Sequence, residues 1–243
     1  RPELHKARGL LAELLLNEKR PAEAEPHYRE LLAVPEFAAL AHVGVADAAR
    51  AQDRLEDAVA GYRAALALDP AQVTPTRALA WTLARLGRHD EAFAAYDACL
   101  AQLPGDDALL RARADLMMLV GRLPEAALAW KELLDRNAGD LEARSRFAIV
   151  AEYLGHPESA QAHAELVLRA RPDDPEMQLI HIRALLRAGD DAGVRAALET
   201  LGRKPLGEGQ SRLAWNYLGR VHDRAGEAAE AVHCFAEAQR GMP

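Results

Sequence analysis

Two groups of apolar positions between residues 79 and 104 follow the spacing of amphipathic helices. The first group is Leu79, Ala80 and Leu83, and the second, at i, i+4 and i+7, is Ala92, Tyr96 and Cys99. The segment between them, Gly87-Arg88-His89-Asp90, predicts a tight turn, and Pro104 ends the second helix because proline cannot continue one. The pattern predicts a helical hairpin, which needs copies of itself on both sides to bury its apolar faces.

The same pattern recurs along the chain at a step of 34 residues. Alanine repeats at this step at Ala24, Ala58, Ala92, Ala126 and Ala160. Aromatic residues repeat at Tyr28, Tyr62, Tyr96 and Trp130, and glycine repeats at Gly87, Gly121, Gly155 and Gly189. We expect the alanines to let two helices approach closely, the aromatic rings to fill the seam to the next hairpin, and the glycines to adopt positive φ at the helix ends.

This step and pattern resemble the tetratricopeptide repeat, whose signature is W-x2-L-G-x2-Y followed by Gly, Ala, an aromatic residue, Ala and Pro at set offsets. The last repeat matches the signature at Trp215, Leu218, Gly219, Gly226, Ala231, Phe235, Ala238 and Pro243, with His222 where the family often has Tyr. The resemblance covers nearly the whole chain. It implies an all-α fold, an α-α superhelix in which antiparallel helix hairpins form a right-handed solenoid.

Seven repeats fit the chain as a single solenoid over residues 1–243. Their expected boundaries are about 5–38, 39–72, 73–106, 107–140, 141–174, 175–210 and 211–243. Three extra residues in the sixth repeat are expected in a loop near residues 202–210, where Gly202, Pro205, Gly207 and Gly209 cluster.

Several positions depart from the repeated pattern. Lys19 and Asp53 stand where later turns have glycine, and aspartate tolerates left-handed geometry better than most residues. Ala164 replaces the aromatic residue of the fifth repeat, so that its seam is either looser or filled by a neighbour such as Phe147. Gln178 and His181 take positions that are usually apolar, and we expect their polar ends to reach a backbone carbonyl rather than a ligand.

Composition fits a long helical array with seams of alanine and leucine, since 50% of the 243 residues are apolar and only 5% are aromatic. The net charge of −7 argues against a general nucleic-acid binder. No apolar run is long enough for a transmembrane helix.

Cys99 and Cys234 fall in repeats that are not neighbours, so both thiols are expected to be free and at least partly buried. The cytoplasm is slightly favoured, but the chain opens at Arg1, so a removed leader and a periplasmic location stay open.

The sequence predicts no catalytic residue, no metal site and no cofactor, and therefore no enzyme. Phosphate-binding, dinucleotide-binding and zinc motifs are missing from the sequence. Paired carboxylates such as Asp106-Asp107, Asp173-Asp174 and Asp190-Asp191 fall at turns, where they are expected to cap helices.

The resemblance implies a binding groove, because in similar proteins the first helix of each hairpin lines the concave face. The groove residues that it implies here are Arg77, Trp81, Arg85, Arg111, Asp115, Met118, Ile149, Tyr153, Arg183, Arg187, Asn216, Arg220 and Arg224. Arginine and aromatic residues are typical of binding hot spots. The alternative is that about half of the apolar groove residues pack against neighbouring helices, and that the arginines pair with nearby carboxylates.

Three functions stay open at this stage. The first is a scaffold that binds a peptide or a protein segment in the groove. The second is the recruiting arm of a larger enzyme, similar to sulfotransferases or glycosyltransferases with such repeats, whose catalytic domain is not in this chain. The third is self-assembly as a homo-oligomer, since the last helix would leave Val232 and Phe235 partly uncovered.

Overall fold

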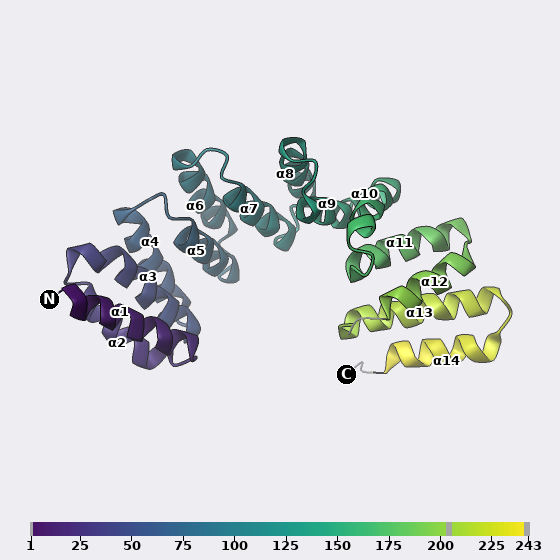
Figure 1. Ribbon diagram of the computed structural model, residues 1–243, viewed down its shortest axis with the longest axis horizontal. Helices are drawn as coiled ribbons and strands as arrows, with labels where there is room; N and C mark the ends of the chain where they lie inside the picture. The colour runs from purple at the N-terminus through teal and green to yellow at the C-terminus, as the bar shows by residue number, and fades with distance from the viewer. Residues whose placement is uncertain (1, 203–205, 241–243) are drawn as a thin grey trace. The chain divides into compact units, whose positions relative to one another are not determined.

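The computed structural model describes residues 2–202 and 206–240, and over these residues the chain forms fourteen α-helices and one short 3₁₀ helix without any strand (Figure 1). The helices are α1 (Pro2–Asn17), α2 (Pro21–Leu31), η1 (Pro35–Phe37), α3 (Ala38–Ala51), α4 (Leu55–Leu68), α5 (Val73–Arg85), α6 (His89–Gln102), α7 (Asp107–Leu119), α8 (Leu123–Arg136), α9 (Leu141–Tyr153), α10 (Pro157–Ala170), α11 (Pro175–Ala188), α12 (Asp191–Leu201), α13 (Glu208–Arg224) and α14 (Ala228–Gln239). The all-α prediction is confirmed, and each expected repeat contributes two helices.

The helices fall into two compact units, residues 1–121 with α1 to α7 and residues 122–243 with α8 to α14. Within each unit, helices that are consecutive in sequence pack against each other, such as α3 with α4 and α13 with α14. The boundary lies between α7 and α8, inside the expected fourth repeat. A single solenoid over residues 1–243 therefore stays a prediction.

The turns between paired helices share one backbone conformation. Gly87, Gly121, Gly155 and Gly189 have φ between +73° and +78°, as the sequence predicts. Lys19 and Asp53 take the same left-handed conformation, with φ of +61° and +59°. The turn at Lys19 therefore departs from the glycine pattern in sequence but not in backbone conformation. The geometry of the hairpin imposes the left-handed conformation even where the side chain makes it unfavourable.

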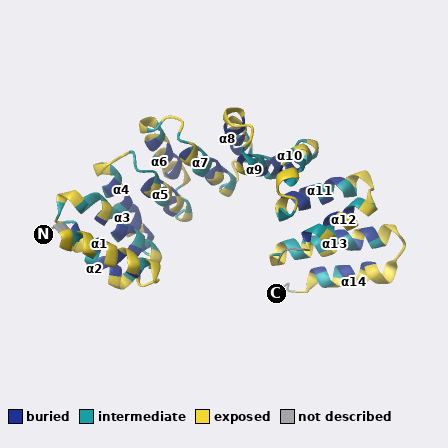
Figure 2. Cartoon of the chain, in the orientation of Figure 1, coloured by how far each residue is buried: buried dark blue, intermediate teal, exposed yellow. Residues whose placement is uncertain are grey.

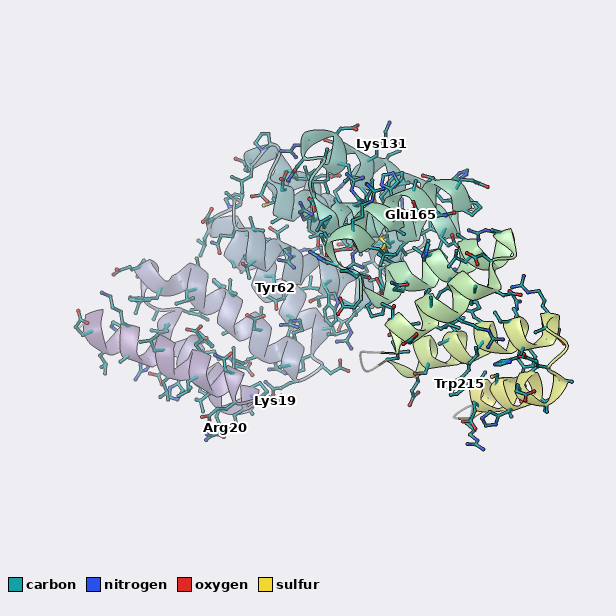
Figure 3. The ribbon with its side chains drawn as sticks, turned by 45° about the vertical axis from the view of Figure 1, so that its right-hand side comes forward. Lys19, Arg20, Tyr62, Lys131, Glu165 and Trp215 are labelled. Atoms are coloured by element: carbon teal, nitrogen blue, oxygen red, sulfur yellow. The ribbon has the colours of Figure 1, made fainter. Side chains whose placement is uncertain are left out.

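Replacing Lys19 with glycine should therefore raise the free energy of unfolding by about 1 kcal/mol, because glycine adopts positive φ without the steric cost of a Cβ atom. Lys131, in the exposed middle of α8, provides the control (Figure 3). There the same change should cost about 1 kcal/mol, because glycine is a poor helix former. Urea denaturation of both variants measures the two shifts. A destabilised Lys19→Gly variant would contradict the strain at this turn.

The core of each unit lies in the seams between helices, where buried positions alternate with exposed ones around each helix (Figure 2). The repeated alanines from Ala24 to Ala160 are fully buried, and the rings of Tyr28, Tyr62, Tyr96 and Trp130 are no more than 4% exposed. Both sets of residues are therefore buried, as expected of residues that lie in the seams.

The fifth repeat fills its seam without an aromatic residue at the repeated position. Ala164 is fully buried in a cluster with Met177 and Ile180, and Phe147 packs against this cluster while partly buried. Of the two alternatives for this seam, the structure supports the one in which a neighbour such as Phe147 fills it, together with two apolar side chains from α11.

Aspartates begin several helices, as expected from the paired carboxylates. The side chain of Asp106 accepts a hydrogen bond from the backbone N–H of Leu109 at 2.9 Å. Asp174 and Asp190 accept the equivalent hydrogen bonds from the backbone N–H groups of Met177 and Gly193. Each carboxylate satisfies an amide that the first turn of a helix leaves without a partner.

The two polar residues of α11 behave differently. Gln178 donates to the carbonyl of Pro172 at 2.6 Å, as expected. The expectation is wrong for His181, because its buried Nδ1 has no hydrogen-bond partner in the part of the chain that the structure describes. His181 lies almost one turn further into the helix, beyond the turn carbonyl that Gln178 reaches.

The sixth repeat has a shorter loop than expected. Helix α13 begins at Glu208, and Gln210 accepts a hydrogen bond from the backbone N–H of Gly207 at 3.3 Å. Gly209 therefore lies in the helix and not in the loop, because this capping contact starts the helix early. Pro205 and Pro243, named in the sequence pattern, lie outside the described residues.

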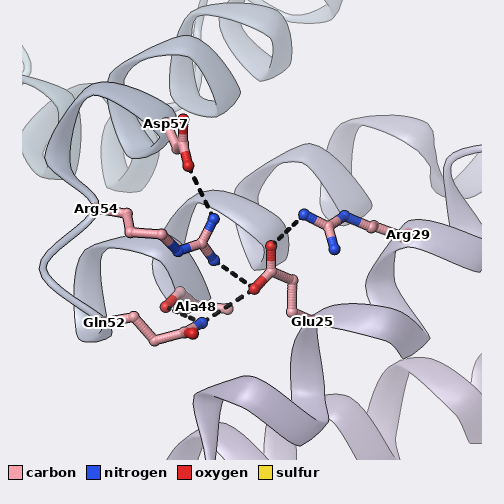
Figure 4. A network of polar contacts seen from close by, with 6 residues as sticks. All are labelled: Glu25, Arg29, Ala48, Gln52, Arg54 and Asp57. Carbon is pink, nitrogen blue, oxygen red and sulfur yellow. Dashed lines mark hydrogen bonds and ion pairs between the residues drawn. The ribbon is translucent and has the colours of Figure 1, made fainter.

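A polar network ties the first hairpin to the second (Figure 4). Glu25 on α2 is only 5% exposed and accepts hydrogen bonds from Arg54 and from Gln52, which lie in the turn between α3 and α4. Arg29, one turn along α2, pairs with its other oxygen at 2.5 Å. Burial raises the pKa of Glu25, but Arg54, Gln52 and Arg29 together outweigh burial, so that its pKa lies below the usual value.

Because this pKa is lower in the folded state than in the unfolded state, the stabilisation is present above the ordinary pKa of about 4.5 and is lost as the pH falls through the folded value. Glu25→Gln should therefore cost about 1 kcal/mol at neutral pH, with a smaller difference from the wild type in acid. Urea denaturation across this pH range measures the effect, with Glu132→Gln on the exposed face of α8 as the control. A difference that stays constant down to low pH would contradict the role of the carboxylate.

Candidate binding site

A hollow of about 550 Å³ lies in the first unit, between α3, α5, α6 and α7. We call it the Trp81 hollow, and its lining consists of Arg50, Thr74, Arg77, Ala78, Trp81, Tyr96, Ala112, Asp115, Leu116 and Leu119. Most of its surface is apolar, and the charged groups lie among apolar side chains. This combination is typical of ligand sites.

Trp81 is the most unusual residue of this hollow, because a large indole ring stays 44% exposed. The guanidinium carbons of Arg85 and Arg50 lie 5.0 Å and 5.6 Å from the centre of the ring, within the range of cation–π attraction. Arg85 is the i+4 neighbour of Trp81 on α5, whereas Arg50 comes from α3. The ring is contacted by arginines from two helices and still presents apolar surface.

Both arginines are themselves anchored by polar contacts. Arg85 pairs with Asp53 at 2.8 Å. The Nε atom of Arg50 donates to the hydroxyl of Tyr62 at 3.0 Å, and this hydroxyl donates to Asp47 at 2.5 Å. The position of Trp81 is therefore fixed before any ligand binds.

The lining of the hollow also carries one phenol and two opposite charges, those of Tyr96, Arg77 and Asp115. Burial raises the pKa of Tyr96 to about 12; Arg77 lowers this pKa and Asp115 raises it. The phenol therefore stays protonated near neutral pH. Arg77 is exposed and forms no ion pair within the described part of the chain, so its guanidinium is available to an anionic group.

The structure brings together several predicted groove residues of the first unit. Arg77, Trp81 and Asp115 line the Trp81 hollow, and Arg85 stacks on its indole ring. Arg111 and Met118 are half-buried on α7, make contacts with other residues, and do not line it.

A second hollow of the first unit was missed by the sequence argument. It measures about 560 Å³, lies between α1 and α3, and its lining includes Lys6, Gly9, Glu13, Leu40, Val43 and Asp47. The signal was present in the sequence, because Val43 and Asp47 stand one 34-residue step before Arg77 and Trp81, and Gly9 and Glu13 stand two steps before them.

Four predicted residues of the second unit meet in another hollow, between α11 and α13, of about 480 Å³. We call it the arginine hollow, and its lining consists of Arg183, Leu186, Arg187, Leu213, Asn216, Tyr217 and Arg220. The predicted groove residue Arg224 does not line it. Its guanidinium pairs with Asp191 at 2.5 Å and donates to the carbonyl of Leu186 at 3.3 Å.

The two predicted groove residues of α9 differ from each other. Tyr153 is 73% exposed, whereas Ile149 is partly buried and packs against the cluster around Ala164. The packing alternative considered for Ile149 is therefore confirmed.

Two further hollows contain few of the predicted groove residues or none of them. A hollow of about 310 Å³ between α4, α5 and α6 includes Arg63 and Glu91 in its lining. Another, of about 480 Å³ near Trp215, includes Glu208, Glu237 and Arg240. Val232 on α14 is 68% exposed and Phe235 is half-buried, as the sequence predicts.

No group of three or more His, Cys, Asp or Glu side chains in the described residues could hold a metal ion. Cys99 and Cys234 are buried and free, as expected. Within the same residues, no helix is both long enough and apolar enough to cross a bilayer.

Helix hairpins that pack on one another in a repeated pattern define an α-helical repeat protein. Family models described as tetratricopeptide repeat match residues 10–73, 73–116 and 145–205, which is more than half of the chain. The chain belongs to the tetratricopeptide repeat family, whose members generally mediate protein–protein interactions and act as scaffolds without catalysis. No curated protein matches the chain.

Solved structures show the same fold at low sequence identity. The C-terminal part of a TPR repeat-containing protein from Cytophaga hutchinsonii is 14% identical with a TM-score of 0.71, and the match covers 95% of this chain and 93% of that one. A tetratricopeptide repeat protein from Parabacteroides merdae is 16% identical with a TM-score of 0.69, over 97% of this chain and 92% of that one. YrrB, described as a TPR protein with an unusual peptide-binding site, is 17% identical with a TM-score of 0.53, over 70% of this chain and 88% of that one.

Proposed function

We propose that the chain is a scaffold that binds a peptide segment of a protein partner at the Trp81 hollow. The observation that carries this proposal is the indole of Trp81, which is 44% exposed although Arg50 and Arg85 fix its position. An exposed ring that is already ordered gives up little conformational entropy on binding, so that its apolar area contributes to affinity.

The lining of the hollow supports a peptide as the ligand. Trp81 and Leu119 offer apolar surface to a side chain, Arg77 offers a charge-assisted hydrogen bond to a carboxylate or carbonyl, and Asp115 offers an acceptor to a backbone amide. The volume of about 550 Å³ lies in the range of pockets that bind small ligands or a few side chains. YrrB, a structural neighbour, is described as having a peptide-binding site, which agrees with this use of the fold.

Selection of a displayed random-peptide library on the immobilised chain tests the proposal. Peptides that bind the wild type should bind Trp81→Ala at least about tenfold more weakly, because aromatic anchors dominate such interfaces. Trp215→Ala, which removes another exposed indole outside the hollow, is the matched control and should keep the affinity. Selected peptides that bind wild type and Trp81→Ala equally well would contradict the proposal, and so would a selection that enriches no peptide.

A further inference from the structure

The arginine hollow between α11 and α13 differs from the other hollows in its charge. Its lining contains Arg183, Arg187 and Arg220 but no carboxylate. Each of the four other hollows described above contains at least one carboxylate, namely Asp115, Asp47, Glu91 or Glu208. In a chain with a net charge of −7, this local excess of positive charge requires an explanation.

The positions of the arginines follow from helix geometry. Arg183 and Arg187 are i, i+4 neighbours on α11, and Asn216 and Arg220 are i, i+4 neighbours on α13. Side chains at this spacing lie on the same face of a helix. Both pairs line one hollow, and Leu186, Leu213 and Tyr217 supply apolar surface between them.

The protein neutralises only part of this charge. Glu152 on α9 lies 3.0 Å from Arg183 and 3.7 Å from Arg187, so that one carboxylate is shared by two guanidinium groups. Arg220 is exposed and forms no ion pair with any residue that the structure describes. Asn216 donates to the carbonyl of Arg212 at 2.9 Å, which leaves its side-chain oxygen available.

We propose that the arginine hollow binds an acidic segment of a protein partner. Carboxylates of the segment pair with Arg187 and Arg220, and an apolar side chain between them packs on Leu186 and Leu213. Guanidinium groups suit this role, because their planar fork binds carboxylates through two parallel hydrogen bonds. Charges spread over two helices fit a run of acidic side chains better than a single compact phosphate. The inference goes beyond the proposed function, because it concerns a different hollow in the other unit and does not depend on Trp81.

Fluorescence anisotropy with the whole chain tests the inference. The probe is a labelled peptide in which glutamate alternates with leucine, and the comparison peptides carry glutamine or phosphoserine in place of glutamate. The glutamate peptide should bind at least about tenfold more tightly than the glutamine peptide, and raising the salt from about 50 to about 300 mM should weaken it several-fold. Equal binding of the glutamate and glutamine peptides would overturn the inference. A phosphoserine peptide bound far more tightly than the glutamate peptide would also overturn it, in favour of a phosphate site.

Variants locate the site and separate it from a general charge effect. Arg187→Gln combined with Arg220→Gln should weaken the affinity for the glutamate peptide about tenfold. Arg169→Gln combined with Arg195→Gln removes the same charge from α10 and α12 and should change this affinity less than twofold. Equal losses in both double variants would overturn the inference.

Glu152→Gln gives the sharpest result, because it removes the internal competitor for Arg183 and Arg187 without removing bulk. The affinity for the glutamate peptide should increase about threefold or more, and a misfolded variant cannot produce such an increase. Weaker or unchanged binding in this variant would count against the inference. Trp81→Ala should leave this binding unchanged, so that failure here and failure of the proposed function are distinguishable.

Discussion

Replacing Trp130 with alanine will lower the free energy of unfolding by about 3–5 kcal/mol. The indole is the largest fully buried side chain in the described part of the chain, with 1% of its surface exposed on α8. Its removal loses the transfer free energy of a large apolar group and leaves a cavity that the surrounding helices fill only in part. The loss should therefore be close to the upper end of single-residue effects in a protein of this size.

Urea denaturation followed by circular dichroism measures this loss. Trp81→Ala is the matched control, because its indole is 44% exposed and its loss should cost clearly less. Repeat arrays can unfold in steps, so the two variants must be compared on the transition that Trp130→Ala shifts. A Trp130→Ala variant within about 1 kcal/mol of the wild type would contradict the burial of the ring.

Replacing Gly44 with alanine will destabilise the chain by about 1–3 kcal/mol, although alanine is the better helix former. A Cβ atom at Gly44 would lie 2.4 Å from ring carbons of Tyr28, much closer than atoms can pack. The ring of Tyr28 is 4% exposed in the seam between α2 and α3, so it has little room to move. Glycine at this position allows the aromatic ring of the repeat to lie directly on the next helix.

Gly9→Ala on α1 is the matched control, because a Cβ atom there meets only ordinary contacts at 3.7 Å or more. This variant should be more stable than the wild type by about 0.5–1 kcal/mol, since alanine has less backbone entropy to lose than glycine. A double-mutant cycle with Tyr28→Leu checks the mechanism, because the double variant should be more stable than the sum of the single changes predicts. Strict additivity, or a stable Gly44→Ala variant, would contradict the close contact.

The fold could be predicted from the sequence because its signal is repeated. One alanine or one glycine is weak evidence, but Ala58, Ala92 and Ala126 at a constant step require the same seam each time. Departures at single positions did not change the backbone, as Lys19 shows with its positive φ. The neighbouring repeats impose the geometry of each repeat. A turn therefore tolerates a residue whose own conformational preference is different.

The candidate sites could be predicted only in part. Periodicity places Trp81 and Arg220 on the first helix of their hairpins, but exposure depends on what the neighbouring helix carries. Ile149 has an equivalent position and packs on the core, because α10 and α11 present aliphatic residues there. In the network around Glu25, the hydrogen-bonded partners Gln52 and Arg54 lie 27 and 29 positions further along the chain, and no local sequence pattern indicates such pairs.

The central claim is that the function of the chain lies in a preformed surface around Trp81, and a crystal structure of the chain with a library-selected peptide tests it most directly. We predict that the peptide lies in the hollow lined by Arg77, Trp81 and Leu119, with a side chain on the indole and with Arg50 and Arg85 still within cation–π distance of the ring. A peptide bound elsewhere, with Trp81 still open to solvent, would contradict the claim.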